Sequence, residues 1–197
     1  MTLLIATTNP HKAAEIRALL TGLPVRLDTL TEHPGLEAPE ETGATFAANA
    51  RLKAIAYSRQ TGLAAAADDS GLEIDALDGA PGVRSARFNG NSYAEKFAAI
   101  YRQLRARGAQ TSSARFVCAV AVADGGRIVF ETRGVVEGTI APAPAGAGGF
   151  GYDPIFFHPP SRRTFAEISA VEKAAVSHRG RALRALRDYL AAAAETG

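Results

Sequence analysis

The sequence contains a single cysteine, no long hydrophobic run and no excess of charge of one sign. With only Cys118 present, an internal disulfide is excluded, and no Cys/His cluster has the spacing of a zinc site. The N-terminal region lacks a basic segment, and its apolar run of Leu3 to Ala6 is too short for a signal peptide or a membrane span. We therefore expect a cytoplasmic protein in a reducing compartment.

The charge balance excludes some partners. The 22 basic and 20 acidic side chains leave a formal net charge of +2, which is too small to steer the protein onto nucleic acid or an anionic membrane. Hydrophobic residues make up 47% and charged residues 21% of the chain, values typical of soluble globular proteins. At 197 residues the chain is long enough for one hydrophobic core, so we expect a single domain spanning residues 1–197.

Apolar runs and helical patterns give a coarse map of the secondary structure. They predict strands near 3–6, 25–30, 63–67 and 72–77, and helices after Pro10 and over 45–61 and 93–107. The runs 115–123 and 127–136 flank Asp124-Gly125-Gly126, which predicts a β-hairpin. A final helix is expected over about 178–194, with Ser177 as its N-cap. The Gly-rich segment 138–151 fits either a flexible linker or a binding loop, and its adjoining aromatic residues favour the loop.

A polar segment between the first strand and the first helix is a candidate phosphate site. Hydroxyls, backbone N–H groups at a helix start and one ammonium can hold phosphates without a glycine-rich loop. The segment consists of Thr7, Thr8, Asn9, Pro10, His11 and Lys12. Taken alone, it also fits an ordinary capped helix with an exposed lysine.

A second group of polar residues surrounds the start of the predicted helix 45–61. Asn49 and Lys53 are four residues apart, so their amide and ammonium share one helix face and can point at one polar ligand. Glu40 and Glu41 lie in the loop before this helix. Taken alone, the glutamates are better explained as a solvated acidic loop.

The motif Asp68-Asp69-Ser70-Gly71 follows an apolar run and is placed at a strand end. Adjacent carboxylates there can bind a hard divalent ion such as Mg²⁺ while one of them orients or deprotonates water. Two acids repel one another, so burying them without a cation is costly. The alternative is an Asx turn that leads into a hairpin.

A fourth group combines aromatic and cationic side chains. An aromatic face can stack on a nucleobase, and cationic donors can recognise a ring carbonyl. The group comprises Gly149, Phe150, Gly151, Tyr152, Asp153, Lys173, Ser177, His178 and Arg179. A surface cluster of salt bridges is the competing interpretation.

Taken together and in order, these motifs resemble one family, the Ham1/RdgB inosine/xanthosine triphosphate pyrophosphatases. The resemblance runs from about Leu4 to Leu190. It rests on the segments Thr7-Thr8-Asn9-Pro10-His11-Lys12, Asp68-Asp69-Ser70-Gly71-Leu72, Gly79-Ala80-Pro81-Gly82-Val83 with Ser85-Ala86-Arg87-Phe88, Gly149-Phe150-Gly151-Tyr152-Asp153-Pro154 and Ser177-His178-Arg179-Gly180.

The resemblance implies an α/β fold with an elongated, twisted mixed sheet flanked by helices, and two lobes with a nucleotide cleft between them. It also implies a homodimer and Mg²⁺ as the cofactor. The implied reaction is hydrolysis of the non-standard purine nucleotides ITP, dITP and XTP to the monophosphate and pyrophosphate. Such an enzyme would remove deaminated purines from the nucleotide pool.

The resemblance also assigns roles to individual residues. By similarity, residues Thr7 to Lys12 and Lys53 should hold the triphosphate, Glu40 or its neighbour Glu41 should hold Mg²⁺ together with Asp69, and Asp68 should support them. Asp69 is expected to activate the attacking water. The residues expected to contact the nucleoside are Ser70, Phe150, Gly151, Tyr152, Asp153, Lys173, His178 and Arg179.

Base selectivity can be argued from donors and acceptors. Hypoxanthine and xanthine carry a C6 carbonyl where adenine carries an amino group, so cationic donors should disfavour ATP. Guanine shares this carbonyl, so rejection of GTP requires a pocket that disfavours its 2-amino group. Two other functions fit the same motifs, namely a pyrophosphatase for other modified nucleotides and a nucleotide-binding protein without catalysis.

Overall fold

A mixed β-sheet organises the chain in a computed structural model that describes residues 2–195. The strands are β1 (Thr2–Ile5), β2 (Arg26–Thr29), β3 (Ala64–Ile74), β4 (Ser113–Asp124), β5 (Arg127–Ile140), β6 (Phe156–His158) and β7 (Arg163–Thr164). They form one seven-stranded sheet in the order β2-β1-β3-β4-β5-β6-β7. β1 pairs in parallel with β2 and β3, whereas β6 pairs antiparallel with β5 and β7. The predicted α/β fold with a mixed sheet is confirmed.

Helices and short 3₁₀ segments connect the strands. The helices are α1 (Pro10–Leu20), α2 (Phe46–Thr61), α3 (Tyr93–Ala106), α4 (Ala170–Val176) and α5 (His178–Glu195). The 3₁₀ segments are Leu30–Glu32, Asp75–Leu77, Gly82–Arg87, Asp153–Ile155 and Pro159–Ser161. Within residues 2–195, none of the helices has the length and apolar character needed to span a membrane.

The chain divides into two compact units. Unit 1 comprises Met1–Asp69, Cys118–Gly134 and His178–Gly197, and unit 2 comprises Ser70–Val117 and Val135–Ser177. The length of the chain predicts one core, but the described residues form two hydrophobic clusters, one in each unit. The reason is that β3, β4 and β5 are long strands whose residues contribute to both units. The assignment of residues 1–197 to a single domain stays a prediction.

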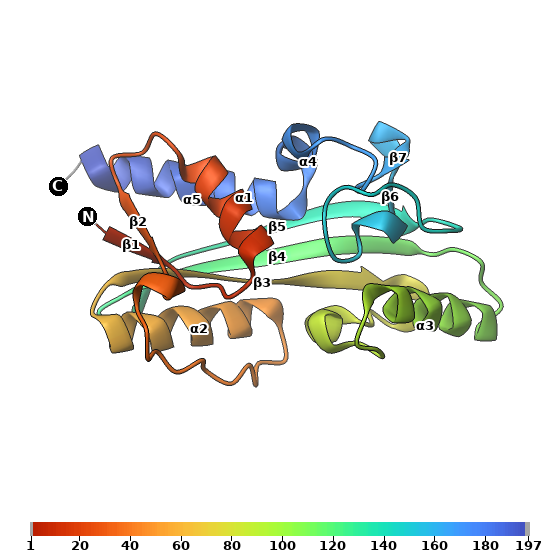
Figure 1. Ribbon diagram of the computed structural model, residues 1–197, viewed down its shortest axis with the longest axis horizontal. Coiled ribbons are helices and arrows are strands. Elements are labelled where there is room, and N and C mark those ends of the chain that lie inside the picture. The colour runs from red at the N-terminus through yellow and green to blue at the C-terminus, as the bar shows by residue number, and fades with distance from the viewer. Residues whose placement is uncertain (1, 196–197) are drawn as a thin grey trace. The chain divides into compact units, whose positions relative to one another are not determined.

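Unit 1 packs helices on both faces of its strands. α1 and α5 lie side by side on one face, and α2 lies on the other (Figure 1). Apolar side chains of α1 and α5, among them Ile16, Leu183 and Leu186, pack on Leu3 and Ile5 of β1. Thr45 caps the start of α2 and left-handed Gly62 ends it, close to the bounds predicted from the sequence.

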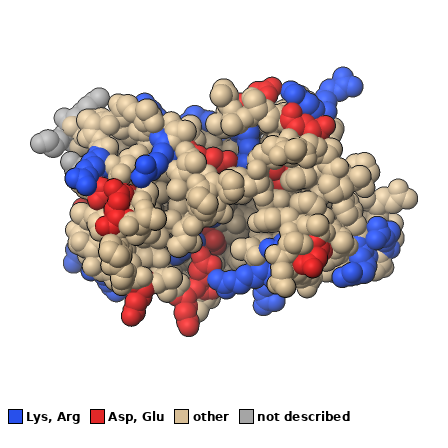
Figure 2. Space-filling view, viewed as in Figure 1, with Lys and Arg blue, Asp and Glu red and all other residues tan. Residues whose placement is uncertain are grey.

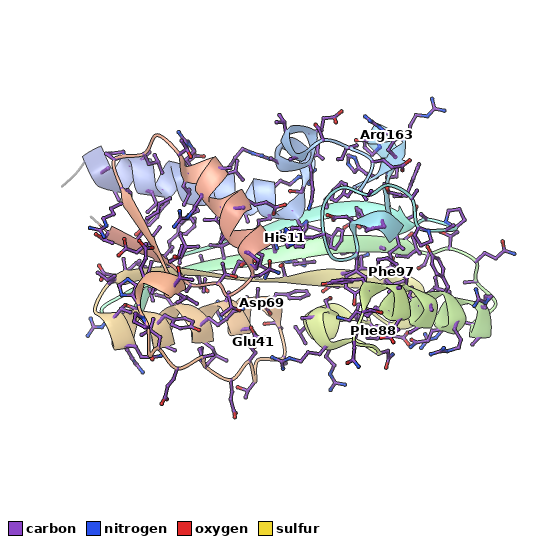
Figure 3. The ribbon with its side chains drawn as sticks, viewed as in Figure 1. His11, Glu41, Asp69, Phe88, Phe97 and Arg163 are labelled. Carbon is purple, nitrogen blue, oxygen red and sulfur yellow. The ribbon has the colours of Figure 1, made fainter. Side chains whose placement is uncertain are left out.

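Unit 2 has an aromatic core. Phe116, Phe156 and Phe165 pack on one another with ring centroids 4.5 to 6.0 Å apart. In the same cluster, Phe97 of α3 is buried. Phe88, in the segment before α3, packs against this cluster (Figure 3). This core supports the Gly-rich loop and α4, which carry the predicted base-binding residues of unit 2, among them Phe150 and Lys173.

Three details of the sequence-based map are wrong. β3 continues without a break through 68–71, so this motif is neither a strand end nor an Asx turn. Residues 138–140 belong to β5 rather than to the Gly-rich loop. The short helix α4 was not predicted. Ser177, which was predicted only as the N-cap of the last helix, is the C-cap of α4 and directly precedes α5. The predicted hairpin is confirmed, because β4 and β5 are sheet neighbours joined by Gly125 and Gly126, both with positive φ.

The surface charge agrees with the small net charge. On the face seen in Figure 2, acidic and basic side chains are interspersed among uncharged ones, and neither sign dominates.

Candidate active site

The paired acids Asp68 and Asp69 lie inside β3, just beyond the point where its parallel neighbour stops. The last registered pair of β1 and β3 is Ile5 with Ala66. Successive side chains of a strand point to opposite faces, so the two carboxylates diverge. Asp68 lies on the same face as Ala66, which packs with α1 and α5, and Asp69 lies on the α2 face. The strand thus separates two acids that a turn would have kept together.

Asp68 is a buried counter-ion for two cations. Its Oδ2 lies 2.9 Å from Lys12 Nζ and 3.4 Å from Arg179 Nη2, and the residue is 2% exposed. Burial alone would raise the pKa of Asp68, but the charges of Lys12, Arg179 and Lys53 outweigh it and hold this pKa well below its usual range. Arg179 also binds Glu15 of α1 at 2.7 Å. Asp68 is therefore ionised in the folded protein.

Asp69 occupies a different environment on the other face of β3. Asn49 Nδ2 donates to Asp69 Oδ2 at 3.1 Å, and Lys53 Nζ lies 3.4 Å from Asp69 Oδ1. Burial raises the pKa of Asp69, and the charge of Lys53 and the hydrogen bond from Asn49 only partly offset this effect. Asn49 and Lys53 share one face of α2, as their spacing predicts. A carboxylate with a raised pKa in a polar cluster is a candidate general base.

Glu41, rather than Glu40, joins this cluster. Lys53 Nζ lies 2.8 Å from Glu41 Oε1, and the same ammonium faces Asp69. Figure 3 shows Asp69 on β3 and Glu41 in the loop before α2. Glu40 is exposed. Burial alone would lower the pKa of Lys53. The negative charges of Asp69, Asp68 and Glu41 outweigh this effect and raise the pKa above its usual value.

The donor chemistry of Asp69 and Glu41 fits a hard cation. Carboxylate oxygens are the ligands that Mg²⁺ takes, and it commonly uses one or two of them and completes its shell with water and phosphates. Among residues 2–195, no group of three or more His, Cys, Asp or Glu side chains is gathered closely enough to hold a metal ion. Asp69 and Glu41 alone therefore do not form an all-protein cage.

The segment before α1 is held by its own side chains. The Asn9 side-chain oxygen accepts from the backbone N–H groups of His11 and Lys12, at 2.9 and 3.3 Å. Asn9 N–H in turn donates to Thr7 Oγ1 at 3.2 Å. Thr8 and Pro10 are exposed, as is His11 at the start of α1 (Figure 3). The predicted phosphate segment is thus a capped helix start, and Lys12 links it to Asp68 in unit 1.

The predicted base-binding residues of unit 2 form a compact group. Lys173 Nζ lies 2.6 Å from Asp153 Oδ2 and 4.3 Å from the centre of the Phe150 ring. Phe150 N–H donates to the same oxygen at 2.7 Å. A Cβ at Gly149, where φ is +66°, would overlap the Asp153 carboxylate, so only glycine fits there. Tyr152 is buried and donates to the Ser85 carbonyl at 2.7 Å.

His178 and Arg179 are buried at the start of α5, in unit 1. The backbone there approaches β5 so closely that a Cβ on Gly134 would collide with the His178 carbonyl. Arg179 pairs with Asp68 and Glu15 of unit 1, whereas Lys173 and Phe150 belong to unit 2. Contacts of His178 and Arg179 with a base stay predictions, as does the contact of partly buried Ser70 with a nucleotide.

Sequence reasoning missed two contributors to the site. Glu15 follows Lys12 by three residues on α1, a spacing that places both on one helix face. The helix α4, which carries Lys173, begins with a capping box of Ser169 and Glu172 that the sequence displays as Ser-x-x-Glu. Both signals are local and could have been found.

Comparison with known proteins places this geometry in a family. The pattern of the Ham1 family matches residues 3–189. The chain belongs to the Ham1 family. Among its relatives are proteins named dITP/XTP pyrophosphatase: that of Exiguobacterium sp. is 46% identical over 94% of this chain and 95% of its own length, and that of Gloeobacter violaceus is 48% identical over 93% and 91%.

Solved structures agree with this membership. A HAM1 protein from Coxiella burnetii has a TM-score of 0.90 at 42% identity, covering 96% of this chain and 98% of its own. The Ham1 protein of Staphylococcus aureus has a TM-score of 0.86 at 33% identity, with the same coverage. The Ham1 match includes every residue of the two groups described above.

Proposed function

We propose that this chain hydrolyses the non-standard purine nucleotides ITP, dITP and XTP to the monophosphate and pyrophosphate. The observation that carries the proposal is the name dITP/XTP pyrophosphatase, shared by relatives that match this chain over more than nine-tenths of its length. The cluster of Asp69, Glu41 and Lys53 supports it, because carboxylates beside an ammonium suit phosphoryl chemistry.

Mg²⁺ is the proposed cofactor, held by Asp69 and by a glutamate of the acidic loop. Glu41 is the better candidate, since it shares Lys53 with Asp69 while Glu40 is exposed. The ion would supply Lewis-acid polarisation of a phosphoryl oxygen and neutralise developing negative charge. Asp68 would act indirectly, by holding Lys12 and Arg179 in place.

In the proposed mechanism Asp69 accepts a proton from the attacking water. The water oxygen forms a bond to the α-phosphorus while the bond from this phosphorus to the bridging oxygen breaks, and pyrophosphate leaves. Asp69 is proposed for this role because its carboxylate lies in the polar cluster with Asn49 and Lys53. Lys12 and Lys53 would neutralise charge on the leaving pyrophosphate, with residues 7–11 holding the phosphates through hydroxyls and backbone N–H groups.

The base would be recognised by the group in unit 2. Phe150 would stack on the ring, Gly151 would leave room beside it, and Asp153 would hold Lys173 toward the C6 carbonyl. His178 and Arg179 are proposed as further donors to the base, and Ser70 as a contact of the nucleotide. Adenine carries an amino group at C6, so the Lys173 ammonium would face a donor instead of a carbonyl oxygen and ATP would bind poorly.

The test is Mg²⁺-dependent pyrophosphate release from ITP, dITP, XTP, GTP, ATP and dTTP, with the monophosphate identified. Turnover confined to the inosine and xanthosine nucleotides is expected. Release of orthophosphate, or equal rates for all bases, would contradict the proposal. Binding of Mg²⁺ and ITP without turnover would instead identify a nucleotide-binding protein.

We also propose a homodimer, and a cytoplasmic location where the nucleotide pool is accessible. Light scattering coupled to size exclusion would test the first through a mass of twice 20.6 kDa. Fractionation of the source cells would test the second.

A further inference from the structure

The acidic loop is tied to α2 at both ends by side-chain amides. Gln60 Oε1 accepts from Glu37 N–H at 2.9 Å, and Gln60 Nε2 donates to the Glu37 carbonyl at 3.0 Å. At the other end, Asn49 Oδ1 accepts from Gly43 N–H at 2.7 Å. Glu41 lies in the span that these two anchors enclose. The loop is therefore fixed to the same helix that carries Lys53.

Asn49 differs from Gln60 because it also holds a site carboxylate. Its Nδ2 donates to Asp69 Oδ2 at 3.1 Å, and the residue is 2% exposed. The orientation of the amide is determined by its partners, because the Gly43 N–H requires an acceptor and the Asp69 carboxylate requires a donor. No other uncharged side chain of this size offers both atoms in a plane.

The close fit at Gly43 is an independent observation. A Cβ at this position would lie 2.6 Å from Asn49 Oδ1 and 2.7 Å from Ala48 Cβ. Side chains are therefore excluded at residue 43 by the approach of Asn49, with no unusual backbone angle involved. The loop and the amide are packed so tightly that the position of one fixes that of the other.

We propose that Asn49 is a positioning residue that fixes the Asp69 carboxylate and the Glu41 loop in one geometry for the reaction. The assignment rests on the proposed function. Asn49 holds one carboxylate oxygen, Oδ2, while the other, Oδ1, faces Lys53. One carboxylate oxygen is thus held by Asn49, and the other is directed toward the Lys53 ammonium, which also binds Glu41. Groups that orient the ligands of a metal or a base typically contribute about 10- to 100-fold in affinity or activity.

Three variants separate the two contacts of Asn49. Asn49→Ala removes both. Asn49→Asp keeps the volume and the acceptor for Gly43 N–H but places a carboxylate oxygen against Asp69. Gln60→Ala is the matched control, because it releases the other end of the loop without touching Asp69. We expect kcat for ITP to fall about 10- to 100-fold in both Asn49 variants, with KM changed less than about threefold, and kcat of Gln60→Ala to stay within about threefold of wild type.

A second measurement does not depend on turnover. Mn²⁺ binding is followed by electron paramagnetic resonance in the presence of α,β-imido-ITP, which resists cleavage. Asn49→Ala should weaken Mn²⁺ binding about tenfold, and Gln60→Ala should change it little. Hydrogen exchange of the 37–45 peptide should increase in both Asn49→Ala and Gln60→Ala. This increase would show that each variant frees the loop.

The outcomes are distinguishable from failure of the proposed function. Absence of ITP turnover by the wild-type protein would contradict the function itself, whatever the variants do. With an active wild type, kcat of Asn49→Asp within about threefold of wild type would overturn the positioning role. A fall in Gln60→Ala as large as that in Asn49→Ala would overturn it too, because attachment of the loop alone would then explain the effect.

Discussion

The same substitution at the two adjacent acids is expected to have opposite consequences. In Asp68→Asn, the amide cannot compensate Lys12 and Arg179, whose nitrogens lie 2.9 and 3.4 Å from the Asp68 carboxylate. Removing one partner of a buried ion pair costs about 3–5 kcal/mol. The side chain of Lys12 is 15% exposed and can turn toward water, and Arg179 keeps its contact with Glu15. We therefore expect the lower end, about 3 kcal/mol, which corresponds to a fall in Tm of about 6–12 °C for a chain of this size.

Asp69→Asn should leave stability nearly unchanged and remove turnover. Because burial raises the pKa of Asp69, its ionised form is disfavoured in the folded state, and loss of the charge offsets the weaker contact with Lys53. We expect stability within about 1 kcal/mol of wild type. Loss of a general base lowers the rate of the chemical step about 10²- to 10⁴-fold.

Urea and thermal unfolding, together with pyrophosphate release from ITP, measure both effects. The matched control is Asp78→Asn, because the Asp78 carboxylate is 82% exposed and pairs with Arg107 at 2.7 Å on the surface. It should cost at most about 1 kcal/mol. If Asp68→Asn were as stable as Asp78→Asn, the role of Asp68 as a buried counter-ion would be refuted. Near wild-type turnover of Asp69→Asn would refute its role as base.

Three further variants test other parts of the structure. Lys173→Met removes the ammonium from the Asp153 carboxylate, which is 3% exposed, and should cost about 3–5 kcal/mol in urea unfolding while lowering kcat/KM for ITP. Backbone N–H groups at the start of α3 lower the pKa of Glu95. The stabilisation that the ionised Glu95 gives to the folded protein is therefore complete above about pH 4.5 and is lost as the pH falls through the lowered pKa. The Tm advantage of wild type over Glu95→Gln should shrink from pH 6 to pH 3. Gly134→Ala forces a Cβ onto the His178 carbonyl and should destabilise by at least about 1–3 kcal/mol in thermal unfolding, whereas a neutral effect would contradict the close approach of α5 and β5.

Local signals predicted most of the secondary structure. Gly125 and Gly126 have the positive φ values that a two-residue hairpin turn requires, so the turn could be found from sequence alone. Thr45 and Gly62 bound α2 through a cap and a left-handed residue. Asn49 and Lys53 share a helix face because of their spacing. In each case, the residues that decide the structure are neighbours in the chain.

The path of β3 could not be predicted in this way. Asp68-Asp69-Ser70-Gly71 has the composition of a turn, and local propensity favours one. The strand continues because Lys12 and Arg179 compensate the first acid from one face and Lys53 the second from the other. These cations come from α1, α5 and α2, far away in sequence, so no window around the motif reveals them.

Continuity of β3 is what gives two neighbouring acids different chemistry. Side chains that alternate across a strand place Asp68 among cations, where its pKa falls, and Asp69 beside an amide and one ammonium, where burial raises it. A shift of register by one residue would move each acid to the opposite face of the sheet. The register is set immediately before the acids, where Ile5 pairs with Ala66 and Ala6 N–H donates to the Ala66 carbonyl at 2.8 Å. The pairing of β1 with β3 therefore helps to determine which acid meets the cations of α1 and α5 and which one faces α2.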